Sequence, residues 1–145
     1  MANDRRHLAL FLSGLSGGGA QRRMLTLAGS FAIRGQLVDL VVPRSRGPFA
    51  AQLPAEVRLV ALDPCASRLP GVASRRPWLV LGTIPALAGY LRRERPGAVL
   101  STSNPANLAC VLARELAGCG TPVVLCANIH LSAAIARRAR AWRPL

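Results

Sequence analysis

Short apolar runs alternate with longer segments of helical periodicity along this chain. Five of the runs have the length and the continuous apolar character of strands that are buried on both faces of a sheet. They cover residues 8–12, 37–42, 57–62, 98–101 and 122–126. Because a helical or turn-rich segment separates each run from the next, we predict an α/β fold, in which a parallel sheet of about five strands carries helices on both faces.

The helices are predicted from apolar spacing and from the residues that start and stop them. A helix that begins near Ala20 is expected to end before Gly35, and another is expected to run from Thr83, as its N-cap, to Arg95. Two more helices are expected over residues 106–117 and 132–143, and a short helix over 49–53. Residues 65–76, which are rich in Pro, Gly, Ser and Arg, are expected to form a loop. Residues 78–82 could extend either of the neighbouring segments.

Four segments follow the carboxyl ends of predicted strands. In a parallel sheet these ends share one edge, and ligands bind in α/β proteins just beyond it. The segments are residues 13–19, 43–48, 101–105 and 127–131. We therefore look for a binding site along this edge, and we expect His7, at the other end of the first strand, to be a solvated residue.

The first of these segments is unusually rich in glycine. Residues 13–23 read SGLSGGGAQRR, with an apolar run before them and a helical pattern after them. Such a turn presents backbone N–H groups at the positive end of a helix dipole, which suits a phosphate or a sugar diphosphate. The alternative is that the glycines only permit a tight turn. A dinucleotide fingerprint fails because Arg22 stands at its third glycine, and a Walker A loop fails because Ala20 and Gln21 replace Lys and Ser or Thr.

The composition narrows the range of partners. The net charge is +13, from 19 basic residues that are all arginine against 6 acidic ones, and this favours anionic partners. No aromatic-rich sheet, helix-turn-helix or zinc pattern supports nucleic-acid binding.

The four cysteines show no C-x-x-C spacing, so we expect reduced thiols in a cytoplasmic protein, with no metal site. The longest apolar window, residues 78–91, is too short and too interrupted for a membrane-spanning helix.

Several motifs, taken in order, resemble one enzyme family. Residues 12–22, LSGLSGGGAQR, are similar to the G-G-A-[EQ]-R turn of family 4 glycosyltransferases, which have the GT-B fold. Residues 34–41, RGQLVDLV, resemble that family's R-G-H-x-V-x-L-V segment. Further similar segments are residues 25–28, 91–96, 100–102, 107–109 and 122–128. The single motifs are short, but their joint order covers nearly the whole chain.

The resemblance implies a fold, an activity and separate acceptor and donor domains. It identifies residues 1–145 as a truncated, Rossmann-like N-terminal domain, the acceptor side of a GT-B enzyme whose C-terminal donor domain is absent. The enzyme would transfer a sugar from a nucleotide-diphosphate sugar to a glycan or lipid-linked acceptor in cell-envelope polysaccharide synthesis, without a cofactor. Glu94 and Glu115 stand alone, and no E-x7-E donor motif is present. The chain by itself is then expected to be inactive, and an inactive binding module or, less favoured, a dinucleotide-binding protein are the alternatives.

The resemblance also implies site residues. The donor phosphates and sugar would contact Gly17, Gly18, Gly19 and Arg22, and the acceptor would contact Ser103, Asn104, Asn128 and His130. No catalytic residue is identified, and His130 is a candidate only.

Each acceptor-side residue has an alternative role. Ser103 and Asn104 could instead cap the following helix. His130 could be a local hydrogen-bonding residue, because Cys126 replaces the acidic residue that the family carries in this loop.

The C-terminal segment is strongly basic. Residues 132–143 carry four arginines and Trp142, a pattern typical of a helix that meets anionic lipid. This predicts peripheral contact with the inner face of the membrane. The alternative is a solvated connection toward the missing C-terminal domain.

Overall fold

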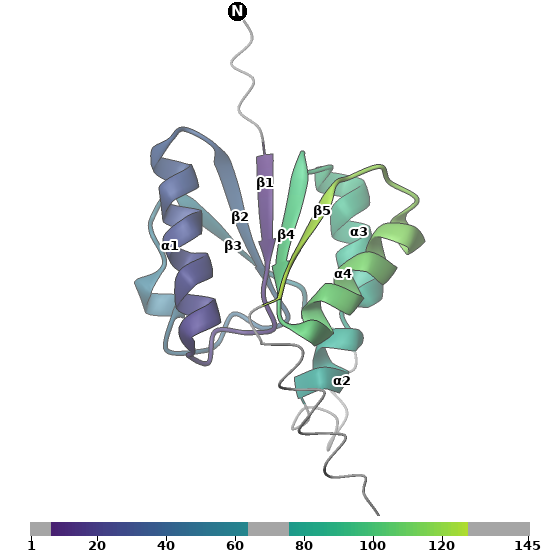
Figure 1. Cartoon of the computed structure of the whole chain (residues 1–145), viewed down its shortest axis with the longest axis horizontal. Helices are drawn as coiled ribbons and strands as arrows, with labels where there is room; N and C mark the ends of the chain where they lie inside the picture. Colours follow the sequence, from purple (N-terminus) through teal and green to yellow (C-terminus); the bar gives the residue numbers. More distant parts are fainter. Residues whose placement is uncertain (1–6, 64–75, 128–145) are drawn as a thin grey trace, which may run out of the picture.

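The computed structural model describes residues 7–63 and 76–127. Its five strands form one parallel sheet in the order β3-β2-β1-β4-β5 (Figure 1). The strands are β1 (His7–Phe11), β2 (Leu37–Val42), β3 (Val57–Ala61), β4 (Ala98–Thr102) and β5 (Val123–Cys126). The helices are α1 (Gly19–Ile33), the short 3-10 helix η1 (Ala50–Gln52), α2 (Arg76–Leu81), α3 (Ile84–Glu94) and α4 (Asn104–Ala117). The predicted α/β architecture is confirmed.

The helices lie on both faces of the sheet, as predicted. Helix α1 covers one face, and α3 and α4 cover the other (Figure 1). Two details differ from the prediction. Residues 76–81 form α2, which is not among the predicted elements, and α4 begins at Asn104 rather than Ala106, because Pro105 is tolerated in the first turn of a helix.

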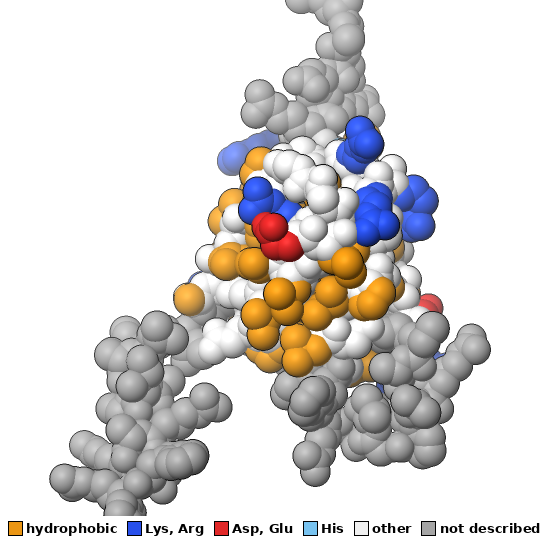
Figure 2. Space-filling model, turned by 90° about the vertical axis from the view of Figure 1, so that its right-hand side faces the viewer, with side chains coloured by type: hydrophobic (Ala, Val, Ile, Leu, Met, Phe, Trp, Pro, Cys, Tyr) orange, Lys and Arg blue, Asp and Glu red, His pale blue; other side chains and the backbone are white. Residues whose placement is uncertain are grey.

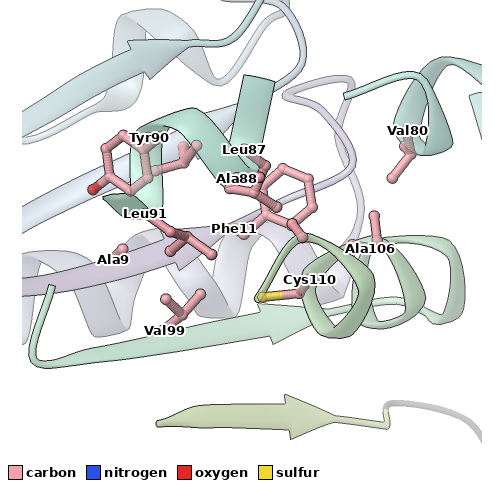
Figure 3. Close-up of a cluster of buried hydrophobic side chains, with 13 residues drawn as sticks. Ala9, Phe11, Val80, Leu87, Ala88, Tyr90, Leu91, Val99, Ala106 and Cys110 are labelled. Carbon is pink, nitrogen blue, oxygen red and sulfur yellow. The ribbon is translucent and has the colours of Figure 1, made fainter. Parts of the chain in front are cut away.

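The core consists of two layers that share β1. Successive side chains of a strand point to opposite faces, so Leu10 and Leu12 pack with α1, whereas Ala9 and Phe11 pack with α3 and α4. Figure 3 shows the second layer, where Phe11 lies among side chains of α3, α4 and β4. Burial raises the pKa of the Cys110 thiol in this layer to about 12, so it stays protonated and unreactive.

The amino edge of the sheet carries a group of paired polar side chains, His7, Asp39, Arg58, Tyr90 and Glu94, which we call the amino-edge cluster. Asp39 is its centre, with a side chain only 4% exposed. Its Oδ2 lies 2.9 Å from His7 Nε2 and accepts a hydrogen bond from the Tyr90 hydroxyl at 2.6 Å. Arg58 donates to both carboxylate oxygens, at 2.8 and 2.5 Å, and also to Glu94 at 2.9 Å.

This cluster corrects two expectations from the sequence. His7 is not a solvated residue, because its side chain is only 19% exposed and it pairs with Asp39. Glu94 is not isolated, because it pairs with Arg58, which lowers the pKa of Glu94. Burial alone would raise the pKa of Asp39, but the hydrogen bonds from Arg58, Tyr90 and His7 hold that pKa below its usual value.

One side of the molecule exposes apolar side chains. On α4, large exposed apolar residues recur at helical spacing between the buried positions of that helix, and β5 at the edge of the sheet adds two more. Figure 2 shows exposed apolar side chains gathered on this side of the molecule. We call this set the apolar row: Leu108, Val111, Leu112, Leu116, Val124 and Leu125, each at least 37% exposed. No helix within residues 7–63 and 76–127 is long and apolar enough to cross a bilayer.

Candidate functional site

The candidate site lies where the strand order reverses. From β1 the chain proceeds through β2 to β3 on one side, and then returns to place β4 on the other side of β1. The carboxyl ends of β1 and β4 are therefore neighbours from which the chain departs in opposite directions, and such a switch point is where open α/β sheets bind ligands. The segments that follow these two strands are the glycine-rich stretch and Ser103.

The glycine loop, residues 13–19, leads directly into α1. Gly14, Gly17 and Gly18 have φ values of +152°, +100° and +143°, which L side chains rarely adopt. Gly18 is the N-cap of α1 and Gly19 its first residue. No side chain caps this helix end and no acidic residue stands in its first turn. The first N–H groups of α1 therefore have no capping side chain, and an anion can use them.

A single buried leucine anchors the glycine loop. Leu15 is 1% exposed, and its carbonyl accepts a hydrogen bond from the backbone N–H of Phe49 at 3.3 Å. Gly47 approaches the same carbonyl so closely that a Cβ at Gly47 would lie 2.3 Å from the Leu15 oxygen. The loops after β1 and β2 are thus packed against each other, which defines the position of the glycine loop.

Arg22 lies on the side of α1 that faces the loop after β2. Its guanidinium sits 5.7 Å from the centre of the Phe49 ring, within the range of a cation–π contact. It also lines a groove along α1 together with Thr26, Gln52 and Pro54. A role of Arg22, Gly17, Gly18 and Gly19 toward donor phosphates stays a prediction; the structure places Gly18 and Gly19 at the start of α1.

The structure adds Gln21 to the residues of this region. Gln21 is 9% exposed, and its Oε1 is buried without a hydrogen-bond partner. This oxygen lies 3.2 Å from the position of a Cβ on Gly18, so it lies against the glycine loop. Sequence reasoning missed it, although the signal was present: Gln21 precedes Leu25 and Ala28 at the spacing of the buried face of α1.

Ser103 connects β4 to α4 in a strained conformation. Its φ is +83°, and left-handed backbone costs a non-glycine residue about 1–3 kcal/mol. It is the N-cap of α4, but its side chain makes no capping hydrogen bond, so the alternative that its hydroxyl caps the helix is wrong. Ser103 Oγ is buried without a partner, whereas Asn104, the next residue, is exposed.

A chain of hydrogen bonds ties β4, α4 and β5 together beside Ser103. Ser101 Oγ donates to Asn107 Oδ1 at 2.5 Å, and Asn107 Nδ2 donates to the Cys126 carbonyl at 3.3 Å. Asn107 thereby holds the end of β5. The predicted site residues Asn128 and His130 come directly after β5 but lie outside the described residues, as does the basic segment 132–143.

Unpartnered polar atoms are not confined to this edge, since Gln36 Oε1 and Arg114 Nε are buried without partners elsewhere. What distinguishes the switch point is the combination of features found there: uncapped N–H groups, positive φ values and two orphaned side-chain oxygens. Within the described residues, no three His, Cys, Asp or Glu side chains lie together as metal ligands would.

The chain belongs to the glycosyl transferase 4-like domain family, which matches residues 18–145. Among solved structures, its fold is similar to the crystal structure of MurG from Acinetobacter baumannii, with a TM-score of 0.54 and 20% identity. The similarity covers 91% of this chain and 39% of the MurG chain. It confirms the predicted Rossmann-like, GT-B type of fold. The family match confirms the resemblance predicted from the motifs, and no curated protein matches the chain significantly.

Proposed function

We propose that this chain is the acceptor-side domain of a glycosyltransferase that uses a nucleotide-diphosphate sugar. The acceptor would be a glycan or a lipid-linked sugar of the cell envelope, and no cofactor would be required. One observation carries the proposal: the chain belongs to a glycosyltransferase-like family, and its switch point holds an uncapped, glycine-rich helix start beside orphaned oxygens.

The chemistry assigned to each part follows from its atoms. Transfer releases a nucleoside diphosphate, so negative charge develops on the leaving phosphate. Fixed N–H groups at the start of α1 would stabilise that charge, an effect worth about 3 kcal/mol for one well-placed donor. The oxygens of Gln21 and Ser103 are buried without partners, so in this proposal the two side chains turn toward the ligand and bind hydroxyl groups of a sugar, which would satisfy both partners.

The remaining parts of the site would come from residues outside the described ranges. In this proposal Asn128 and His130 contact the acceptor. A C-terminal domain would bind the nucleotide and close the site. Residues 132–143 would contact an anionic membrane at the cytoplasmic face, an idea that rests on their four arginines and Trp142.

The test uses a version of the protein that includes a C-terminal donor domain. Gly19→Val adds a side chain over the helix start without backbone strain, because nothing lies within 4 Å of a Cβ there and its φ is not in the left-handed region. We expect transfer from nucleotide-sugars to fall by about 100-fold, the cost of losing access to such donors. Gly89→Val, at another glycine with open space around it in α3, is the matched control and should leave transfer within about twofold.

A second candidate function is an inactive binding module, and the apolar row favours it. An exposed apolar surface of this kind promotes association with another protein. The two candidates differ in one measurement. Transfer by the version with a donor domain supports the enzyme, whereas absence of transfer with every nucleotide-sugar tested, from a folded protein, supports the binding module.

A further inference from the structure

A polar hollow, separate from the switch point, lies at the carboxyl edge beyond the ends of β2 and β3. It has a volume of about 370 Å³ and is lined by Arg44, Ser45, Arg46 and Asp63. Arg44, Ser45 and Arg46 lie in one of the four segments expected at this edge, but none of the lining residues is among the predicted site residues. The lining is mostly polar, and its two guanidinium groups outnumber its one carboxylate.

The backbone holds the walls of this hollow in place. The hydrogen bonding between β2 and β3 continues past the strands: Leu62 N–H donates to the Val42 carbonyl at 2.9 Å, and Asp63 N–H donates to the Pro43 carbonyl at 3.0 Å. This pairing keeps Asp63 beside the loop that carries the two arginines. Asp63 is therefore held by the sheet pairing, whereas Arg44, Ser45 and Arg46 lie on the loop after β2.

The hollow is also joined to the glycine loop. The segment that contains Arg44 and Arg46 continues into Gly47 and Phe49, which pack against Leu15. A ligand that extends from the switch point along the carboxyl edge would therefore reach the two arginines. This places a positively charged pocket on the β2–β3 side of the glycine loop, across β1 from Ser103 and the end of β5.

We propose that Arg44 and Arg46 bind a phosphate or diphosphate group of the acceptor substrate. The proposal rests on the proposed function, because it assigns an acceptor to this edge. Guanidinium groups present paired N–H donors that match phosphate oxygens, and Ser45 adds a hydroxyl donor. Asp63 opposes an anion, so it limits affinity and allows an acceptor to dissociate after transfer. A lipid-linked acceptor, in which a diphosphate joins sugar and lipid, has this chemistry.

The first experiment measures binding and needs no catalysis. The purified chain is titrated with inorganic pyrophosphate at about 150 mM salt, where distant charges are screened. We expect Arg44→Gln/Arg46→Gln to raise Kd by about tenfold or more, because a hydrogen bond to a charged group is worth about 1.5–3 kcal/mol. Arg46→Gln alone, at an exposed side chain, should raise it less, and Asp63→Asn should lower it.

The matched control is Arg34→Gln, which removes the same charge from an exposed position at the end of α1. It should change Kd by less than about twofold, because a charge beyond a Debye length is screened. An equal effect of Arg34→Gln and of the double variant would mean that the field of all 19 arginines attracts the anion, and the assignment would be wrong. Weaker binding by Asp63→Asn, or no binding by the wild type, would also overturn it.

The second experiment separates acceptor from donor. In the version with a donor domain, Arg44→Gln/Arg46→Gln should raise KM for a lipid-diphosphate-linked acceptor and leave KM for the nucleotide-sugar unchanged. A change confined to the nucleotide-sugar would show that the donor diphosphate occupies the hollow and would contradict the proposal. Binding of pyrophosphate without any sugar transfer would instead refute the glycosyltransferase function and retain the anion site.

Discussion

At the amino edge of the sheet, Asp39 is surrounded by donors from His7, Arg58 and Tyr90, whereas at the carboxyl edge Gln21 Oε1 and Ser103 Oγ have no donor. Both edges contain buried polar atoms on the same sheet. A buried polar group without a partner costs about 1–3 kcal/mol. The amino-edge cluster avoids that cost for Asp39 with pairs from three strands and α3, although Gln36 Oε1, directly before β2, is buried without a partner at the same edge. At the switch point Gln21 and Ser103 retain the cost beside an uncapped helix start, which is expected where a ligand completes the hydrogen bonds.

The backbone shows the same contrast. The glycine loop and Ser103 adopt positive φ values at the carboxyl edge, close to the switch point. At the amino edge, Gly35 and Gly118 also have positive φ, but there they end α1 and α4, with N–H groups that donate to the preceding turn. We infer that substitutions in the amino-edge cluster will change stability, whereas substitutions at the switch point will change sugar transfer.

The largest effect is expected from Asp39→Ala. It leaves the buried Tyr90 hydroxyl and the His7 ring without their shared acceptor, and each hydrogen bond to a charged group is worth about 1.5–3 kcal/mol. Arg58 adds less, because its side chain is 55% exposed and can turn to water. Urea denaturation measures the free energy of unfolding. Glu115→Ala, at an exposed carboxylate 3.8 Å from Arg114, should cost less than about 1 kcal/mol, and equal losses would contradict the comparison.

A somewhat smaller loss is expected from Gly47→Ala. Its φ is +154°, and the added Cβ would lie 2.3 Å from the Leu15 oxygen, so the two loops must separate. Strain and overpacking together should cost about 3 kcal/mol. Gly89→Ala, in α3 with open space around it, should stabilise the protein by about 0.5–1 kcal/mol. Thermal unfolding of the two variants compares them, and an unchanged midpoint in Gly47→Ala would be the contrary result.

A pH dependence is expected from the amino edge. The pKa of Asp39 is lower in the folded protein than the ordinary value of an aspartate, about 3.9. Its contribution to stability is therefore present above that value and is lost as the pH falls through the folded pKa. Stability measured below about pH 4 should fall more steeply in the wild type than in Asp39→Asn, which has no carboxyl group to protonate. Parallel curves would show that other carboxylates dominate.

The smallest effect on stability, and one of opposite sign, is expected from Ser103→Gly. Glycine relieves the strain at φ +83°, so the free energy of unfolding should rise by about 0.5–1 kcal/mol. In the version with a donor domain, sugar transfer should fall by about tenfold, because a hydrogen bond of about 1.4 kcal/mol is lost.

Arg95→Gly is the matched variant at the amino edge. Glycine relieves the backbone strain at φ +43° at the end of α3, so this variant should stabilise the protein by a similar amount. It should not change sugar transfer. A loss of transfer in both variants would show that strain, rather than the Ser103 hydroxyl, matters for activity.

Much of the fold was predictable because it depends on local patterns. β2 lies at the predicted residues 37–42, and Gly35 ends α1 through N–H donation to Ala32, as helix-stop chemistry predicts. α2 was not predictable with confidence from a segment interrupted by Pro and Gly. The amino-edge cluster was out of reach for another reason: its members are far apart in sequence, with the hydrogen-bonded Asp39 and Tyr90 separated by 51 positions, and only the packed sheet brings them together.

The site was predictable in part for the same reason. Gly17, Gly18 and Gly19 have a local signature, and the structure places them at the start of α1 as expected. The orphaned state of Gln21 and Ser103 depends on what surrounds them, so no single-residue pattern reveals it. The placement of Arg22 over Phe49 depends on the loop after β2, a contact between segments that sequence spacing does not encode.

The contact between Gly47 and Leu15 has a consequence for exchanging loops between members of the family. The two loops contact each other through the Leu15 backbone carbonyl. A loop after β1 taken from another member of the family would therefore not fit against the loop after β2 of this chain. The exchangeable module is therefore the pair of loops, residues 13–19 with 43–49, transplanted together. In this chain, replacement of either loop would then require coordinated replacement of the other.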